Sequence, residues 1–255
     1  MNKLNQLFKH SKSGMILTLP WLAALGISYK LAWKYTKSKW LERVGEKAYK
    51  KINDKISWIG GVSAVQYQLN LPVHVGGKTA LQLLGRTHFI PVHGIKEIYL
   101  FMQPEMSLPK WISEKVFPEN IFKICKTSSF GGNINQRSFG VIEREFDGIK
   151  ILLASPERAI LEVLYLVPTK QTFEEAFLLM EGLTNLRPDV VQKLLKNCNS
   201  IKVKRLFLYM AEKNNHPWIS GLNLKKIDLG SGKRKIGDGG VFDSKYQLSV
   251  PKINI

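Results

Sequence analysis

SYKLAWKYTKSKWLERVGEKAYKK, residues 28–51, joins the start signal of a helix to the pattern of a short hairpin. Ser28 is a good N-cap, because its hydroxyl can accept a hydrogen bond from a free backbone N–H group of the first turn. In the helix that this predicts over residues 29–38, Leu31 and Tyr35 share one face. Three lysines share the opposite face: Lys30, Lys34 and Lys37. We therefore expect one face to pack on a core while the other presents positive charge.

Residues 40–51 predict a hairpin directly after this helix. Residues 40–43 would form its first strand, residues 44–47 the turn, and residues 48–51 its second strand. Four basic side chains follow the edges of this hairpin: Arg43, Lys47, Lys50 and Lys51.

Two more helices are predicted upstream. In KLNQLFKH, residues 3–10, the leucines and the phenylalanine recur at the spacing of one helical face. Residues 18–25 predict a second helix, with Thr18 as N-cap, Pro20 in the first turn and Gly26 where the helix ends. Three short helices and a basic hairpin make the order of a winged helix-turn-helix, whose third helix enters the major groove of DNA.

The uncharged run GMILTLPWLAALGIS, residues 14–28, has an alternative interpretation as a secretory signal peptide. No small-residue cleavage site follows it, and the chain continues directly into the next patterned helix. The run is also shorter than the roughly 20 apolar residues that a bilayer crossing needs. We therefore expect a cytoplasmic protein without a membrane partner.

The formal net charge of +18 is concentrated in two segments. Residues 1–55 hold 12 Lys and Arg against 3 Asp and Glu, and residues 190–235 hold 11 against 2. Residues 56–189 hold 13 of each kind and are neutral. Basic charge that is confined to separate segments favours two surfaces that face a polyanion. The alternative is a charge that serves only solubility.

In the winged-helix geometry, side chains at the start of the third helix meet base edges and the flanking elements grip phosphate. The base-facing candidates are Tyr29, Lys30, Trp33 and Lys34, and the phosphate-binding candidates are Lys37, Arg43 and Lys47. In the alternative interpretation, Tyr29 and Trp33 are core aromatics and the lysines form a solvated face.

The neutral middle of the chain predicts helices over residues 56–70 and 76–85, a strand over residues 96–102, and a hairpin over residues 141–154 with Asp147-Gly148 as its turn. GGKT at residues 76–79 lacks the upstream glycine of a phosphate-binding P-loop, because Pro72 occupies that position. We treat it as a loop, and likewise GSGKR at residues 230–234.

Helical patterns dominate the C-terminal part. Pro156 starts a helix, and its predicted buried stripe comprises Ile160, Val163, Leu164 and Val167. The next helix begins with a capping box formed by Thr172 and Glu175. Pro188 starts a third helix. Ser200 caps a fourth helix, whose basic residues are expected to face outward. With the basic residues beyond it, this face makes a second basic surface for DNA, RNA or a protein partner: Lys202, Lys204, Arg205, Lys225, Lys226, Lys233, Arg234 and Lys235.

These patterns predict an α+β protein with two domains. Residues 1–95 would form a winged helix-turn-helix with the helices that follow it. Residues 96–255 would form a mixed α/β domain with a helical bundle portion.

We find no catalytic or metal-binding constellation in the sequence and expect no enzymatic activity, no metal and no cofactor. The five histidines lack metal-ligand spacing, and Cys125 and Cys198 are expected to be buried free thiols. Glu143 and Glu145 share a strand face, as the magnesium-binding carboxylates of nucleotidyl transferases do. In nucleotidyl transferases a glycine-serine turn leads into such a pair, and this sequence lacks that turn. We therefore interpret the two glutamates as part of an exposed acidic face of the hairpin.

Several long motifs occur in one order along the chain: GISYKLAWKYTKSKWLERVGEKAY, LPVHVGGKTALQLLG, SPERAILEVLYLVP, TFEEAFLLMEGLTNLRPDVVQKLLKNC and VKRLFLYMAEKNNHPW. Together they resemble the AbiEi antitoxin family of type IV toxin-antitoxin systems, and the resemblance covers nearly the whole chain.

The resemblance implies a winged helix that binds inverted repeats in its own promoter and represses the operon. It also implies a C-terminal domain that neutralises a cognate AbiEii toxin, itself similar to nucleotidyl transferases. By resemblance Ser28 joins the DNA-reading residues. The chain departs from the family in having Lys39 and Lys47 where we associate glycine with the turns. We expect a monomer in solution that binds cooperatively on DNA. The alternatives are a stand-alone transcriptional regulator and an enzyme of the nucleotidyl transferase type.

Overall fold

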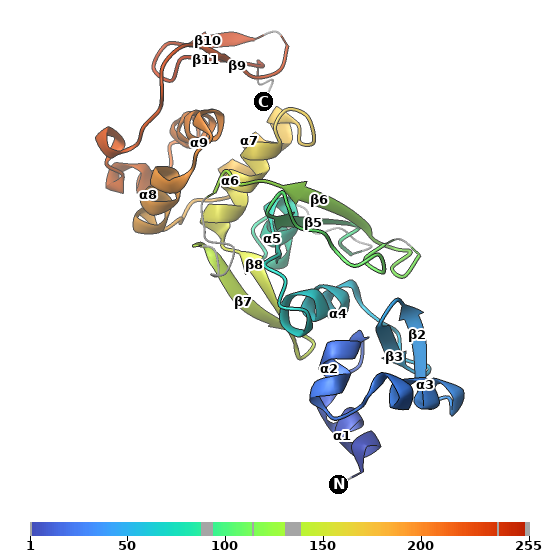
Figure 1. Cartoon of the computed structure of the whole chain (residues 1–255). Helices are drawn as coiled ribbons and strands as arrows, with labels where there is room; N and C mark the ends of the chain where they lie inside the picture. Colours follow the sequence, from blue (N-terminus) through green and yellow to red (C-terminus); the bar gives the residue numbers. More distant parts are fainter. Residues whose placement is uncertain (1, 88–93, 114, 131–138, 239, 253–255) are drawn as a thin grey trace. The chain divides into compact units, whose positions relative to one another are not determined.

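The computed structural model describes residues 2–87, 94–113, 115–130, 139–238 and 240–252 (Figure 1). His88 and His93, for which the sequence predicts no metal-binding role, lie outside these ranges.

The chain forms two compact units. The first comprises Met1–Val75, Ile95–Lys126 and Glu143–Leu153, and the second comprises Gly76–Gly94, Thr127–Ile142 and Ala154–Ile255. The chain thus passes between the units several times, whereas the sequence suggested one division at residue 95. That the two sequence halves act separately stays a prediction.

The N-terminal part of the first unit is a winged helix-turn-helix, as predicted. Its elements are α1 (Lys3–His10), β1 (Leu17–Thr18), α2 (Leu19–Ala24), α3 (Tyr29–Lys37), β2 (Leu41–Gly45) and β3 (Ala48–Lys51). The three strands form an antiparallel sheet in the order β1-β3-β2. Its hairpin turn is tighter than predicted, because β2 extends through Val44 and Gly45.

Local signals account for these boundaries. The Ser28 hydroxyl accepts a hydrogen bond from the backbone N–H of Leu31 at 3.3 Å, which caps α3. Gly26 ends the preceding helix with a φ of +73°. Lys39 and Lys47 adopt φ values of +58° and +55°, the left-handed conformation in which glycine is favoured. The two turns are therefore formed with lysine where the family resemblance suggested glycine.

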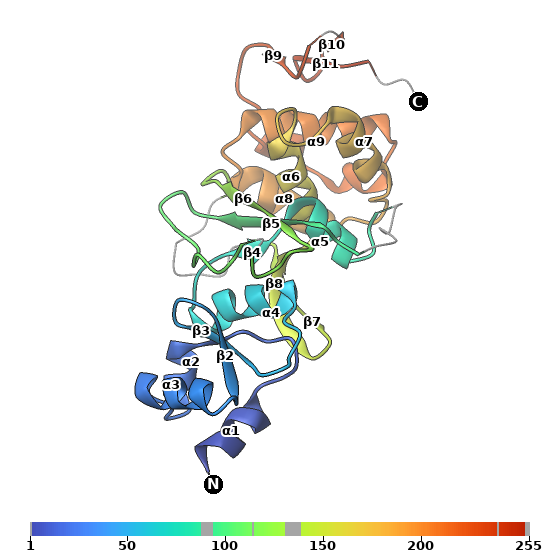
Figure 2. The ribbon, with the colours of Figure 1, turned by 90° about the vertical axis from the view of Figure 1, so that its right-hand side faces the viewer.

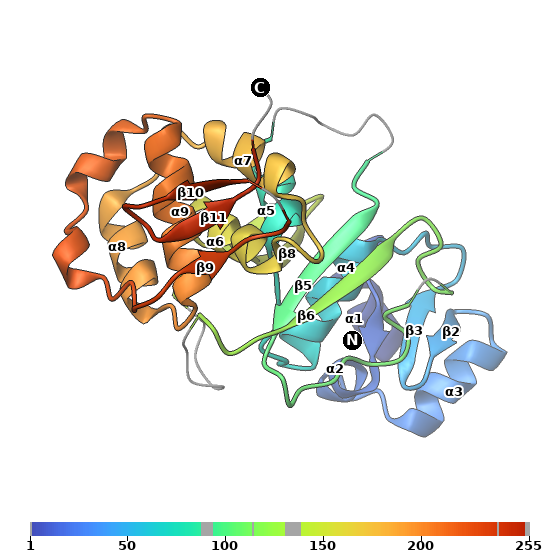
Figure 3. The same cartoon turned by 90° about the horizontal axis from the view of Figure 1, so that it is seen from above.

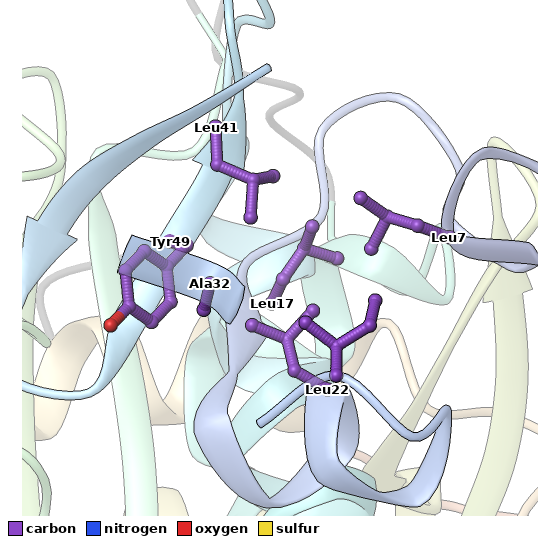
Figure 4. Packing of buried hydrophobic residues seen from close by; sticks show 7 residues of the cluster. Leu7, Leu17, Leu22, Ala32, Leu41 and Tyr49 are labelled. Carbon is purple, nitrogen blue, oxygen red and sulfur yellow. The ribbon is translucent and has the colours of Figure 1, made fainter. Parts of the chain in front are cut away.

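One apolar cluster holds the winged helix together (Figure 4). The fully or almost fully buried residues in it are Leu7, Leu17, Leu22, Ile27, Ala32, Leu41 and Tyr49. They come from all three helices and all three strands, and burial of one leucine side chain contributes about 1.5–3 kcal/mol. This core fixes which face of α3 points outward.

The rest of the first unit contains a five-stranded sheet (Figure 1). Its order is β6-β5-β4-β8-β7, with β4 (His74–Val75), β5 (Glu97–Met102), β6 (Ile121–Lys126), β7 (Val141–Phe146) and β8 (Ile149–Ala154). The strand and the hairpin that the sequence predicted are β5 and β7–β8. The predicted helix at residues 56–70 is α4 (Trp58–Ser63), which continues as one π-helical stretch, η1 (Ala64–Gln68).

The second unit is a helical bundle with a small sheet (Figures 2 and 3). Its helices are α5 (Gly77–Leu83), α6 (Pro156–Leu166), α7 (Phe173–Glu181), α8 (Pro188–Asn197) and α9 (Ile201–Lys213), with short 3-10 turns at η2 (Pro217–Gly221) and η3 (Leu224–Lys226). The sheet order is β10 (Val241–Asp243), β11 (Leu248–Val250) and β9 (Arg234–Lys235). The sequence did not predict this sheet.

Two predictions in this unit need correction. Helix α6 is buried around nearly its whole circumference and not along one stripe, because each of its charged residues has an ion-pair partner. The helix predicted over residues 76–85 is α5, so the interpretation of GGKT as a loop is wrong: Gly76 is the N-cap of α5. The backbone N–H of Gly77 donates to the buried carboxylate of Glu162 at 3.0 Å, so the chain's own carboxylate binds where a P-loop would hold phosphate.

Within the described ranges, no helix has both the length and the apolar composition that a bilayer crossing requires.

Candidate nucleic-acid interface

The inward face of α3 is fixed by its packing against the winged-helix core. Ala32 is fully buried, and Leu31 and Tyr35 pack on the same cluster. All eight side chains that the sequence assigned to DNA are exposed: Ser28, Tyr29, Lys30, Trp33, Lys34, Lys37, Arg43 and Lys47.

The two aromatic residues decide between the alternative interpretations of this helix. Tyr29 is 58% exposed and Trp33 is 51% exposed. The interpretation of both as core aromatics is therefore wrong. Large exposed aromatic side chains beside cations are typical of surfaces that bind a partner.

The positive charge on this face is uncompensated. Of the described carboxylates, none lies within ion-pair distance of Lys30, Lys34, Lys37 or Lys47. The Lys37 ammonium lies 5.4 Å from the centroid of the Trp33 ring, one helical turn away. This cation–π contact restrains the indole on the outward side of the helix.

The hairpin adds a smaller set of free cations. Lys50 pairs with Glu42 at 3.2 Å, so its charge is compensated. The Nε of Arg43 donates to the carbonyl of Gly45 at 3.0 Å, which holds the guanidinium along β2. Lys47 extends from the turn. The wing therefore offers Arg43 and Lys47 to an anion.

Tyr49 lies beneath this face and is almost fully buried. Burial and the neighbouring Tyr29 phenol raise the pKa of Tyr49, while Arg43 acts in the opposite direction. The Tyr49 phenol consequently stays neutral at physiological pH and adds no negative charge beneath the lysines.

The second basic surface is much smaller than predicted. Lys204 and Arg205 were expected to face outward from α9, and this is wrong: their exposed fractions are 4% and 2%. The Lys204 ammonium donates to the carbonyl of Asp228 at 2.7 Å. Lys202 is half-buried and donates to the carbonyls of Tyr165 and Val167, and burial lowers its pKa.

Arg205 is the centre of a carbonyl cluster. Its guanidinium donates to the carbonyl oxygens of Leu229 at 2.7 Å, Gly230 at 3.0 Å, Gly232 at 2.6 Å and Gln247 at 3.3 Å. The glycine-rich segment GSGKR thus wraps around an arginine of its own chain. The members of the predicted surface that remain exposed are Lys225, Lys226, Lys233, Arg234 and Lys235.

The carboxylates that an enzyme of the nucleotidyl transferase type would need are engaged in other contacts. Glu143 accepts a hydrogen bond from the Tyr67 hydroxyl at 2.7 Å and pairs with Lys150 at 2.9 Å. Glu145 lies 4.0 Å from the Lys12 ammonium. A search of the described residues finds no group of three potential metal ligands.

Both cysteines are buried free thiols, as predicted. Burial raises the pKa of the Cys198 thiol, which disfavours the nucleophilic thiolate.

Sequence reasoning gave no role to one further aromatic pair on the winged helix. Phe8 is 40% exposed and Trp40 is 44% exposed, and their rings meet edge to face with centroids 5.9 Å apart. Since Phe8 was expected to share the inward face of α1, only the tertiary structure reveals this pair.

Comparisons with known proteins agree with this architecture. The model of the AbiEi antitoxin N-terminal domain, described as a transcriptional regulator, matches residues 1–92. The model described as transcriptional regulator, AbiEi antitoxin, type IV TA system, matches residues 95–251. No match was found among curated proteins.

One similar solved structure is the crystal structure of the RV2827C protein from Mycobacterium tuberculosis, with a TM-score of 0.59 and 12% sequence identity over 97% of this chain and 89% of that chain. At this identity the likeness concerns the fold alone. Since the two family models together span nearly the whole sequence, the chain belongs to the AbiEi family of antitoxins and transcriptional regulators of type IV toxin-antitoxin systems.

Proposed function

We propose that this antitoxin binds inverted repeats upstream of its own gene, represses that operon, and neutralises a cognate nucleotidyl-transferase-like toxin without being an enzyme itself. The observation that carries the DNA-binding half is the outward face of α3, where exposed aromatic rings alternate with lysines that have no partner among the described carboxylates. Family membership supports the antitoxin half.

On this proposal α3 lies in the major groove and the wing lies on the phosphate backbone. Tyr29, Lys30, Trp33 and Lys34 meet base edges. Lys37, Arg43 and Lys47 bind phosphate and set the register of the helix. The protein is a monomer in solution, and two copies bind the two repeats cooperatively.

Binding of the full-length protein to the upstream duplex and to a scrambled duplex, each across a salt series, tests this proposal. We expect the upstream duplex to bind at least about a thousandfold tighter at physiological salt. If both duplexes bind equally, only a nonspecific polyanion contact remains. The logarithm of affinity would then fall by about 0.9 per neutralised phosphate for each tenfold increase in salt concentration.

The double variant Lys30→Ala, Lys34→Ala should lose about a hundredfold in affinity for the upstream duplex, since two groove contacts are removed. Growth rescue of cells that express the toxin should be unchanged. Lys126→Ala, an exposed lysine of β6 outside the winged helix, is the matched control and should behave as wild type in both assays. Equal loss of DNA binding and of toxin neutralisation in the double variant would contradict separate roles.

The toxin half has a separate test. We expect a reading frame adjacent to the gene of this protein. Its product should stop cell growth when it is expressed alone, and co-expression of this protein should restore growth. Without such a frame the protein would be a stand-alone regulator.

A further inference from the structure

The composition of α3 is unusual for a helix that reads bases. The sequence of the helix is YKLAWKYTK, residues 29–37, and it contains no Arg, Asn or Gln. Arg, Asn and Gln make bidentate hydrogen bonds to guanine or adenine in the major groove, and lysine shares only the contact to guanine. Lys30 and Lys34 can therefore meet guanine edges, but the helix has no side chain for the bidentate contact to adenine, so discrimination of an A·T pair needs another source.

Trp33 occupies the middle of the outward face. Leu31 and Tyr35 mark the inward side of α3. With 3.6 residues per turn, Trp33 lies opposite them, one turn after Tyr29 and one turn before Lys37. An indole in the middle of this face points at the floor of a groove, with Lys30 and Lys34 beside it at base edges and Lys37 toward a phosphate wall.

The indole is also held in place. The Lys37 ammonium lies 5.4 Å from its ring centroid, and half of the side chain remains exposed. An oriented, half-exposed ring can contact an apolar group without a large loss of side-chain entropy. The floor of the major groove offers one apolar group among the four bases, the C5-methyl group of thymine.

We infer that Trp33 determines sequence specificity by packing against a thymine C5-methyl group in each half-site. This inference rests on the proposed function and deepens it, because it names the chemical feature of DNA that the helix selects. Lys30 and Lys34 meet polar base edges beside this contact, and the methyl contact adds discrimination for thymine.

Deoxyuridine tests the inference, because it differs from thymidine only in the missing methyl group. Footprinting of the full-length protein on the upstream duplex first locates the two half-sites. Duplexes with single thymine-to-deoxyuridine replacements are then titrated by fluorescence anisotropy. At one thymine of each half-site we expect about a fourfold loss of affinity, the effect of removing one methyl-sized group from an apolar contact.

Two variants assign the contact to its residue. Trp33→Ala should bind the thymine duplex several-fold more weakly than wild type, and should bind the thymine and deoxyuridine duplexes equally. Lys34→Ala is the matched control on the same face: it should weaken the thymine and deoxyuridine duplexes by the same factor and keep the fourfold discrimination. Because Trp33 is half-exposed, the variant should retain its fold, which circular dichroism checks.

The outcomes separate this inference from the proposed function. If the upstream duplex binds no tighter than the scrambled one, operator recognition fails and the inference fails with it. If the upstream duplex is preferred but every deoxyuridine duplex binds like its thymine parent, the inference is overturned while the proposed function stands. A deoxyuridine penalty that persists in Trp33→Ala overturns the assignment to Trp33.

Discussion

Single residues on α6 show that a charged side chain can belong to the interior. Glu157, Arg158 and Glu162 are almost fully buried. Arg158 pairs with Glu162 at 2.7 Å, and Arg187 pairs with Glu157 at 2.9 Å. A buried charge is tolerated only when it is paired and hydrogen-bonded, and each of these is.

Glu157 makes the stability of the protein depend on pH. Burial alone would raise the pKa of this carboxyl, but hydrogen bonds from Arg187, Ser155 and backbone N–H groups lower it from 4.5 to about 2. Because the folded pKa lies below the unfolded one, ionised Glu157 stabilises the fold above about pH 4.5, on the order of 3 kcal/mol. This contribution is lost as the pH falls toward 2.

Urea unfolding of wild type and Glu157→Gln between pH 7 and pH 2.5 measures this contribution. In the window below pH 4.5, the variant should lose stability more slowly than wild type, by up to about 1.4 kcal/mol per pH unit. Glu174→Gln, an exposed glutamate on α7, is the control and should follow the wild-type curve. Parallel curves for wild type and Glu157→Gln would refute the assignment.

At the scale of elements, α9 and the segment after it depend on one another. Arg205 donates to four carbonyls of residues 229–247, and Lys204 donates to Asp228. The helix thus serves as a template on which the small sheet of β9, β10 and β11 assembles. The basic face of α9 is thus covered by residues 228–247, which follow this helix in the chain.

Arg205→Met should release this sheet. The substitution keeps an unbranched apolar stem but removes the guanidinium, which leaves several carbonyls without their donor, each at a cost of about 1–3 kcal/mol where it is buried. We expect faster amide exchange and faster tryptic cleavage at Lys225, Lys233 and Lys235, while α6 stays protected. Lys213→Met, an exposed lysine at the end of the same helix, should show wild-type protection. Unchanged exchange in Arg205→Met would show that the sheet holds without the arginine.

At the scale of the whole molecule, the net charge of +18 has two different uses. In the winged helix the lysines of α3 are exposed, and none pairs with a carboxylate in the described part of the chain. In the C-terminal segment part of the charge is internal, and Lys235 pairs with Asp238 at 2.9 Å. Segments of similar net charge therefore present different amounts of free cation.

Neutralising the exposed C-terminal cations should affect affinity but not specificity. A variant with Gln at positions 225, 226, 233, 234 and 235 should bind the upstream and scrambled duplexes more weakly by the same factor, with a reduced salt slope. Its preference for the upstream duplex should stay within about twofold of wild type, since base contacts carry specificity. A selective loss of the upstream preference would place sequence reading in this segment as well. Titration of both duplexes at two salt concentrations is sufficient.

The amino-acid sequence by itself determined the winged helix, its caps and the outward face of α3. These features depend on signals within a few residues of one another: an N-cap serine, a helical repeat of apolar residues, and a hairpin with lysines at its turn. The apolar side of a helix with such a repeat packs on the core, and the opposite side therefore faces solvent.

The tertiary structure decided which charges are internal. Glu157, Arg158, Glu162, Lys204 and Arg205 were indistinguishable in sequence from solvated residues. The same holds for buried Gln66, whose carboxamide bonds to the backbone of Val73 and Leu152. The burial of a polar group depends on partners from distant parts of the chain, and no local pattern encodes that pairing.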